Sequence, residues 1–338
     1  MSELVGTYTR ASNRRGQAWA RAALLGLTFA VVGAQNTSTA PTTDPSDSEH
    51  GPLQGHSLTG QALYPMTLAA AQREKLEANL AEARTRFARH PDDPESFIWL
   101  GRRLAYLGRY REAIDIYSEG LERWPDAYAL LRHRGHRWIS VREFQRAIDD
   151  LEAATRLIAG VPDQVEPDGA PNAHNVPRST SHSNIWYHLG LAYYLVGDFE
   201  NALRCYRACL EFSTNDDMLC ATTDWLYMTL RRLERNDEAD AVLQPITADM
   251  QILENGSYHR RLLMYKGALQ PEALLSSADA TELDLATQGY GVGNWYLCNG
   301  NETRAKEIFA RVVQGSYWPA FGFIAAEADL AQLRGRRP

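Results

Sequence analysis

The sequence repeats itself at an interval of 34 residues, and this recurrence restricts the fold more than any other feature. Three pairs of residues show the interval: Gly101 with Gly135, Tyr110 with Phe144, and Ala113 with Ala147. Within one interval the apolar residues lie three and four positions apart, as on one face of an α-helix. Helical units of this length bury their apolar faces only against neighbouring units. The recurrence therefore predicts an all-α superhelical solenoid built from helix hairpins.

The first complete unit shows both helices of such a hairpin. Their apolar stripes are Leu100, Leu104 and Leu107, followed by Ala113, Ile116, Tyr117 and Leu121. Small residues at Gly101 and Ala113 let two antiparallel helices approach closely. Large rings at Tyr110 and Tyr117 fill the gap to the next hairpin. Pro125 ends the second helix, because proline cannot continue a helical hydrogen-bond ladder.

Further units extend the array along the chain. A third clear unit runs from Trp186 to Leu210. The segment 160–183, which precedes this unit, contains four prolines and predicts a loop insert between hairpins. Four other segments follow the helical pattern less closely: 76–90, 226–243, 293–309 and 319–333. We therefore expect about five hairpins with capping helices within residues 63–336.

The pattern of large and small residues resembles the tetratricopeptide repeat (TPR). The residues that carry it in the first unit are Phe97, Leu100, Gly101, Gly108, Tyr110, Ala113, Tyr117 and Pro125. The resemblance implies a solenoid whose first helices line a concave groove, and it implies a scaffold that binds protein or peptide partners there. A cytoplasmic scaffold for a multiprotein complex is one form of this function, and an adaptor outside the cytoplasm is another.

The order of segments between Asn184 and Leu333 is also similar to that of the periplasmic TPR lipoproteins of the NlpI type. The stretches that carry this resemblance are WLYMTLRRLERNDEA, MYKGALQPEALL, GYGVGNWYLCNGNETRAKEIF and FGFIAAEADLAQL. It implies a homodimeric adaptor for enzymes of the bacterial cell envelope. No cysteine stands directly after the N-terminal apolar segment. The lipid anchor of that family is therefore not expected, nor is a stable membrane anchor after signal cleavage.

The N-terminus has the composition of an export signal. Arg10, Arg14 and Arg15 precede an apolar stretch at 22–32, with Arg21 at its edge, and Val32-Gly33-Ala34 provides small residues for cleavage. We interpret residues 1–34 as a signal peptide and residues 35–62, which are rich in Thr, Ser, Pro and Asp, as a disordered linker. This predicts a periplasmic or secreted protein. The alternative is a cytoplasmic protein with an N-terminal arm.

Charge and motif content exclude several function classes. The chain has 35 basic and 42 acidic residues, a net charge of -7, which disfavours nucleic-acid binding. His133 and His136 share a helix but supply only two metal ligands, so no metal site is expected. No nucleophile, phosphate-loop or cofactor motif occurs. We expect no catalysis and no cofactor; the alternative is an enzyme with a site at the insert.

Two other patterns are interpreted as structural. Asp216 and Asp217 precede a helical run and suit the cap of its N-terminus. The string Gly289, Gly291 and Gly293 indicates close helix packing, because no strand precedes it and no basic residue follows closely.

The groove of the expected solenoid would be lined by residues one and two turns along the first helices. These candidates are Arg102, Tyr106, Arg132, His136, Tyr187, Tyr194, Asp224, Arg231 and Asn294. Guanidinium and phenol groups in one groove suit an extended peptide with acidic or polar side chains. For any single residue, the alternative is that it only keeps the face soluble.

Overall fold

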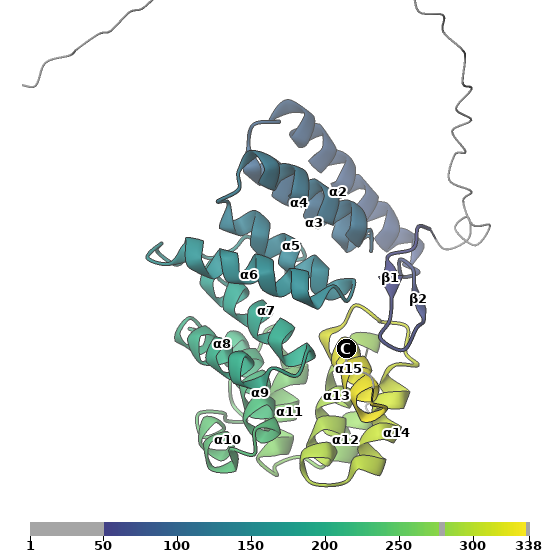
Figure 1. The fold of residues 1–338 in the computed structure, drawn as a ribbon, viewed down its shortest axis with the longest axis vertical. Helices are drawn as coiled ribbons and strands as arrows, with labels where there is room; N and C mark the ends of the chain where they lie inside the picture. Colours follow the sequence, from purple (N-terminus) through teal and green to yellow (C-terminus); the bar gives the residue numbers. More distant parts are fainter. Residues whose placement is uncertain (1–50, 277–280, 336–338) are drawn as a thin grey trace, which may run out of the picture. The chain divides into compact units, whose positions relative to one another are not determined.

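Five helical hairpins in the described residues form an all-α array, as the repeat pattern predicts (Figure 1). The computed structural model describes residues 51–276 and 281–335, which belong to a unit spanning Asp44–Pro338. The hairpins pair α3 (Pro94–Tyr106) with α4 (Tyr110–Arg123), α5 (Tyr128–Ser140) with α6 (Phe144–Ile158), α7 (Ser181–Leu195) with α8 (Phe199–Glu211), α9 (Asp216–Arg232) with α10 (Asn236–Val242), and α13 (Glu282–Cys298) with α14 (Glu302–Val312). The predicted signal peptide, 1–34, and residues 35–50 of the predicted linker lie outside the described residues.

Four more helices complete the array. They are α2 (Ala70–Arg89), α11 (Gly256–Tyr265), α12 (Pro271–Leu275) and α15 (Phe321–Leu333). Helix α2 packs on α3 at the start of the array, and α15 packs on α13 and α14 at its end. Among the described helices, none is long and apolar enough to cross a bilayer.

Small residues allow the helices of a hairpin to approach closely. A Cβ atom on Gly190 would lie 2.9 Å from the ring of Tyr206, so only glycine fits between α7 and α8 at this point. The glycine string in α13 has the same role, since side chains there would meet Val312, Arg261 and Phe309. Close packing, as expected from the sequence, is therefore what these glycines provide.

The turns between paired helices require a left-handed residue, and glycine usually supplies it. Gly108, Gly197 and Gly300 adopt φ values of 75°, 80° and 79°. Arg142 occupies the equivalent position between α5 and α6 with φ 65°. A long side chain at such a site costs backbone strain of about 1–2 kcal/mol, so its contacts must offset that cost.

Residues 51–62, predicted as part of a disordered linker, are instead ordered against the helices. Strands β1 (Gly55–His56) and β2 (Ala62–Leu63) pair antiparallel. Arg111 of α4 donates from Nε to the carbonyl of Gln54 at 2.7 Å, and the Gln54 side chain accepts from the Arg111 backbone N–H at 3.1 Å. The polar composition of the segment does not reveal these partners, which lie more than fifty residues away.

The proline-rich segment between α6 and α7 crosses the concave side of the array. It contains one bridge, between Val165 and Thr180. Helix α7 begins at Ser181, inside the range assigned to the loop, because Thr180 caps it in a reciprocal pair with Ser183. The described part of the chain thus has an insert of 22 residues, 159–180, at this point.

The C-terminal helix folds back onto hairpins near the start of the array. Glu327 of α15 forms a two-pronged ion pair with Arg142, whose Nε and Nη2 atoms lie 2.9 and 3.0 Å from its carboxylate oxygens. Trp318 donates from Nε1 to the carbonyl of Tyr64 at 2.8 Å. We call these two interactions the closure contacts. They hold the C-terminal segment against the concave side.

Candidate functional site

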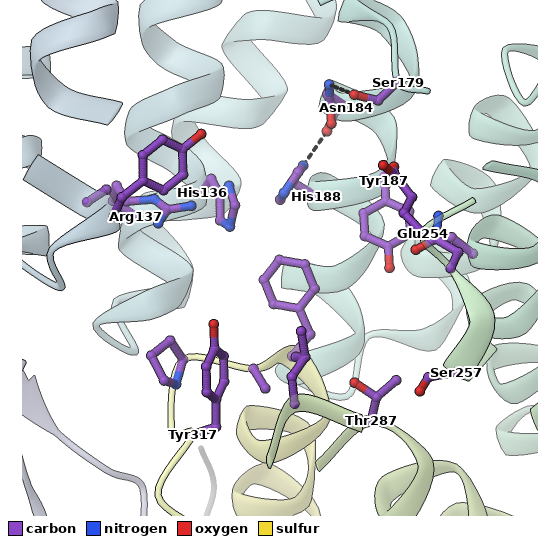
Figure 2. Close-up of a pocket in the computed structure, with 18 of the residues that line it drawn as sticks. His136, Arg137, Ser179, Asn184, Tyr187, His188, Glu254, Ser257, Thr287 and Tyr317 are labelled. Atoms are coloured by element: carbon purple, nitrogen blue, oxygen red, sulfur yellow. Dashed lines mark hydrogen bonds between the residues drawn. The ribbon is translucent and has the colours of Figure 1, made fainter. Parts of the chain in front are cut away.

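The closure contacts leave a cavity of about 500 Å³ on the concave side, which we call the central cavity. Helices α3, α5 and α7 form one wall; α9, α11, α13 and the segment 317–321 form the other. In the view of Figure 2, His136 and Arg137 lie at one end, and Glu254, Ser257 and Thr287 lie at the other. Side chains from both halves of the array therefore face one space.

The repeat-side wall carries a hydrogen-bonded imidazole. His188 donates from Nδ1 to the backbone carbonyl of Asn184 at 2.6 Å, and the Asn184 side chain donates to Ser179 Oγ at 2.9 Å (Figure 2). His136 lies beside it, with the two ring centres 4.2 Å apart. Burial, followed by the charge of nearby arginines, holds the pKa of both imidazoles well below the usual value. Both rings are therefore neutral at pH 7.

The opposite wall is polar and partly acidic. Ser257 donates to Asp284 Oδ1 at 2.6 Å, and the hydroxyls of Tyr187 and Tyr258 lie 3.1 Å apart across the cavity. Burial raises the pKa of the Glu254 carboxyl, while a hydrogen bond from Asn172 opposes this. The aromatic ring of Phe321 extends from this wall to lie near both imidazoles.

A second cavity, of about 220 Å³, is lined by the insert and by residues that also line the first. We call it the basic cavity, because its lining includes Arg102, Arg132, Arg137 and Arg178. Arg132 pairs with Glu166 of the insert at 3.0 Å, and Arg178 pairs with Asp217 at 2.9 Å. The two cavities share His136, Arg137, Asn184 and His188 in their linings.

The chemistry that these cavities offer is non-covalent. They present guanidinium, imidazole, hydroxyl and carboxyl groups together with aromatic faces, which suit recognition of a ligand with both polar and apolar parts. Within the described residues, no group of three or more His, Cys, Asp and Glu side chains is placed to hold a metal ion.

Five of the nine predicted groove residues line these cavities. Arg102 and Arg132 line the basic cavity, Tyr187 lines the central cavity, and Tyr106 and His136 line both. The structure therefore brings these five together on the concave side. Their role in peptide binding stays a prediction.

The other four candidates lie outside both cavities, and the prediction of an exposed position was wrong for three of them, as it was for the cavity residues Arg132 and Tyr187, which are 8% and 7% exposed. Tyr194, Asp224 and Asn294 are 3%, 0% and 1% exposed. Helices α11, α13 and α15 cover the positions that an open solenoid would expose. Arg231 is half-buried and donates to the Tyr227 hydroxyl at 2.9 Å, away from both cavities.

The buried candidates have structural partners. Asp224 pairs with Arg261 at 2.8 Å, and both side chains are fully buried. Burial raises the pKa of Asp224 to about 7, although the charge of Arg261 opposes the shift. Tyr194 donates to the side-chain oxygen of Asn294 at 3.2 Å. These contacts tie α9 to α11 and α7 to α13.

Sequence reasoning missed several cavity residues. Arg137 and His188 lie on the predicted helices, so helical position was the available signal for them, whereas Asn184 lies between the predicted insert and the predicted third unit. Tyr317 and Phe321 had no such signal, because only the fold-back of α15 brings them to the site. Asp217, interpreted as part of a helix cap, instead accepts hydrogen bonds from the backbone N–H groups of residues 253–255; Asn215 is the cap.

The fold and the site define the class of protein. Residues 183–216, which contain α7 and α8, match the family model of the tetratricopeptide repeat. Together with the stacked hairpins, this match supports the resemblance of the chain to the TPR superfamily. A specific relation to the NlpI type is not established by these similarities.

Among curated proteins, the chain is similar to the BBSome complex member BBS4. The Bos taurus protein is 24% identical over 179 residues, which are 52% of this chain and 30% of the relative. The Mus musculus protein is 22% identical over 171 residues, 51% of this chain and 29% of the relative. The chain thus spans less than a third of the length of these relatives.

Solved structures with a similar fold have low sequence identity. A tetratricopeptide repeat protein from Parabacteroides merdae is 15% identical, with 78% of this chain and 94% of that chain covered at a TM-score of 0.45. BtubC from P. vanneervenii is 16% identical, with 80% and 94% covered at a TM-score of 0.41. YrrB, described as a TPR protein with an unusual peptide-binding site, is 15% identical, with 73% and 97% covered at 0.40.

Proposed function

We propose that the chain is a non-catalytic scaffold that binds a short segment of a protein partner in the central cavity. The observation that carries the proposal is the cavity itself, which lies on the concave side of a TPR array. It combines neutral imidazoles, a guanidinium and several phenol rings. Such a mixture of aromatic anchors and a few polar groups is typical of recognition sites.

The size of the cavity limits what the partner can insert. About 500 Å³ is within the range of pockets that enclose a small ligand. It accommodates one or two side chains or a chain terminus, not a long peptide laid along an open groove. The fold-back of α15 takes up much of the space that such a peptide would need.

Site-specific cross-linking tests this function. A photoreactive amino acid replaces Ser257 or Tyr106 in the cavity, and Arg156 on the outer face of α6 serves as control. We expect the two cavity positions to label the same partner segment, which binds the purified protein as a synthetic peptide. Labelling from Arg156 alone, or a peptide whose binding is unchanged in a Ser257→Phe variant that fills the cavity, would contradict the proposal.

We further propose that this scaffold acts outside the cytoplasm, in the bacterial cell envelope. The support is the arrangement of arginines, apolar residues and small residues in positions 10–34. Its relative BBS4 is a member of a protein complex, the BBSome, which supports a role in assembly for this chain in whichever compartment it acts. N-terminal sequencing of the native protein separates the two locations: a start near Gln35 supports export, and an intact Met1 contradicts it.

A further inference from the structure

The basic cavity has no net charge to offer a ligand. The four arginines in its lining are balanced by four carboxylates in or beside it: Glu166, Asp168, Asp217 and Glu254. Two of the arginines form direct ion pairs, Arg132 with Glu166 and Arg178 with Asp217. A ligand with a full charge would bring that charge into a largely buried site without a counter-charge, which is unfavourable. The balance therefore favours an uncharged ligand.

His133 lines the basic cavity and presents a hydrogen-bond donor to it. The residue is 7% exposed. Its Nδ1 lies 2.8 Å from Nη1 of Arg132, and it accepts a hydrogen bond there because a guanidinium can only donate. Burial, followed by the charges of nearby arginines, holds the pKa of His133 well below its usual value, so the ring is neutral at pH 7. Its one proton is therefore on Nε2, which has no hydrogen-bond partner among the residues that the structure describes.

His188 lines the same cavity and presents the opposite group. The residue is 5% exposed. Its Nδ1 donates to the Asn184 carbonyl, so Nε2 of the neutral ring carries no proton and can only accept. This nitrogen also lacks a partner within the described ranges. Buried polar groups are normally paired, so the two free nitrogens indicate a place for a polar ligand or ordered water.

Hydroxyl groups suit both nitrogens, because a hydroxyl donates one hydrogen bond and accepts two. The rest of the lining mixes the two kinds of group in the same way. The guanidiniums only donate, whereas the carboxylates of Glu166 and Asp168 only accept. A molecule with several hydroxyls meets donors and acceptors in any order around its edge. A carboxylate or an ammonium group meets only one kind.

Size and apolar surface restrict the ligand further. The cavity of about 220 Å³ is smaller than the pockets of about 300–1,000 Å³ that hold drug-sized molecules. Tyr106 and Tyr117 line it, and their ring faces can pack against C–H groups. The insert that completes the lining is fixed to α3, since Arg103 donates from Nη1 to the Gly169 carbonyl at 2.8 Å. The space therefore suits a single sugar ring or a short polyol.

We propose that the basic cavity binds a neutral polyhydroxylated small molecule of the size of a monosaccharide, whose hydroxyls accept from His133 Nε2 and donate to His188 Nε2. This inference goes beyond the scaffold function and does not depend on it, because the ligand is a small molecule in a different cavity. The ligand is either a free sugar or polyol or the terminal sugar of a glycan. Both sources present the same hydroxyls.

Isothermal titration calorimetry on the full-length protein tests the inference with a panel of neutral hexoses, pentoses and linear polyols. Uronic acids and amino sugars serve as charged analogues. The best ligand is then compared with its deoxy analogues, which each lack one hydroxyl, and with its methyl glycoside, which mimics a terminal sugar.

Three variants accompany the panel. His133→Leu and His188→Leu each remove one of the two free nitrogens. His259→Leu is the control, because its Nε2 contacts the Thr247 carbonyl at 2.8 Å and the residue lines neither cavity. Circular dichroism checks that each variant is folded. The deoxy series uses the wild type alone, so it decides the case even where a histidine variant does not fold.

We expect a neutral member of the panel to bind at least about tenfold more tightly than its charged analogues. Loss of a hydroxyl that meets an imidazole should weaken binding about ten- to a hundred-fold, the effect of leaving one buried polar group unpaired. His133→Leu and His188→Leu should weaken binding to a similar extent, and His259→Leu should bind as the wild type. A methyl glycoside that binds as well as the sugar identifies a glycan end as the source, and one that is rejected identifies a free molecule.

Three results would overturn the inference. Absence of binding by every neutral member at millimolar concentration would show that water alone fills the cavity. Tightest binding by a charged analogue would show that the hydroxyls are not what the cavity selects. An affinity that is unchanged in the folded histidine variants and across the deoxy series would place the ligand elsewhere. None of these results bears on the partner segment of the central cavity, whose test is the cross-linking described above.

Discussion

Replacing Arg142 with alanine is expected to destabilise the protein by about 4 kcal/mol, because Glu327 then keeps a buried carboxylate without its partner. The Glu327 side chain is fully buried and that of Arg142 is 3% exposed. Arg142 also donates to the carbonyls of Ser140 and Trp318 at 2.6 and 3.0 Å, and these bonds are lost as well. Breaking a buried pair from one side costs roughly 3–5 kcal/mol.

Two further variants separate the ion pair from the backbone. Arg142→Gly removes the same side chain but relieves the left-handed strain at φ 65°, so it should be about 1 kcal/mol more stable than Arg142→Ala. The double variant Arg142→Met with Glu327→Leu removes both charges. It should recover most of the loss, since apolar pairs often replace buried ion pairs without cost.

Urea unfolding followed by circular dichroism measures these differences, provided that the slope of free energy against urea stays constant. The reasoning fails if Arg142→Ala costs less than about 1 kcal/mol, the range of an exposed ion pair. It also fails if the double variant is no more stable than Arg142→Ala, because the unpaired Glu327 carboxylate would then not be the cause of the lost stability.

Three other predictions address the packing, the imidazoles and the loop after α10. Gly190→Ala should cost about 1–3 kcal/mol in thermal or urea unfolding, because the added Cβ meets the Tyr206 ring; a wild-type stability would contradict the close approach. The pKa of His188 is lowered by burial, so the unfolded chain binds a proton that the folded chain does not, and stability falls as pH drops below about 6.5. His188→Gln should reduce the loss between pH 7.5 and 5.5 by about 1.4 kcal/mol, and an unchanged difference would show that His188 is not responsible. Asp217→Ala leaves the N–H groups of residues 253–255 without their acceptor, so limited proteolysis should cut there faster than in the wild type; equal rates would mean that other contacts hold the loop.

The hairpins could be predicted from the sequence because the side chains that define them lie close together along the chain. Gly190 meets Tyr206 sixteen residues later, within one unit, and the spacing of apolar residues records that contact. The same reasoning predicted that Tyr106, His136 and Tyr187 face the concave side. It needed only the helical period and the order of the two helices.

The interior of the concave side could not be predicted, because it depends on contacts between distant segments. Glu327 and Arg142 are 185 residues apart, and neither carries a local signal for the other. Tyr194 and Asn294 were assigned to an open groove for this reason, although they bond to each other in the core. The polar composition of residues 51–62 likewise predicts a disordered linker, because it does not show that Arg111 of α4 binds Gln54 in this segment.

The closure contacts also fix how many repeats the protein can contain. An open solenoid can gain or lose a hairpin during evolution, since each unit depends only on its neighbours. Here an added or deleted unit between Arg142 and Glu327 would move the two residues apart and leave both charges buried alone. Duplication of a hairpin in this interval should therefore be selected against, and length variation should be confined to the insert and the chain ends.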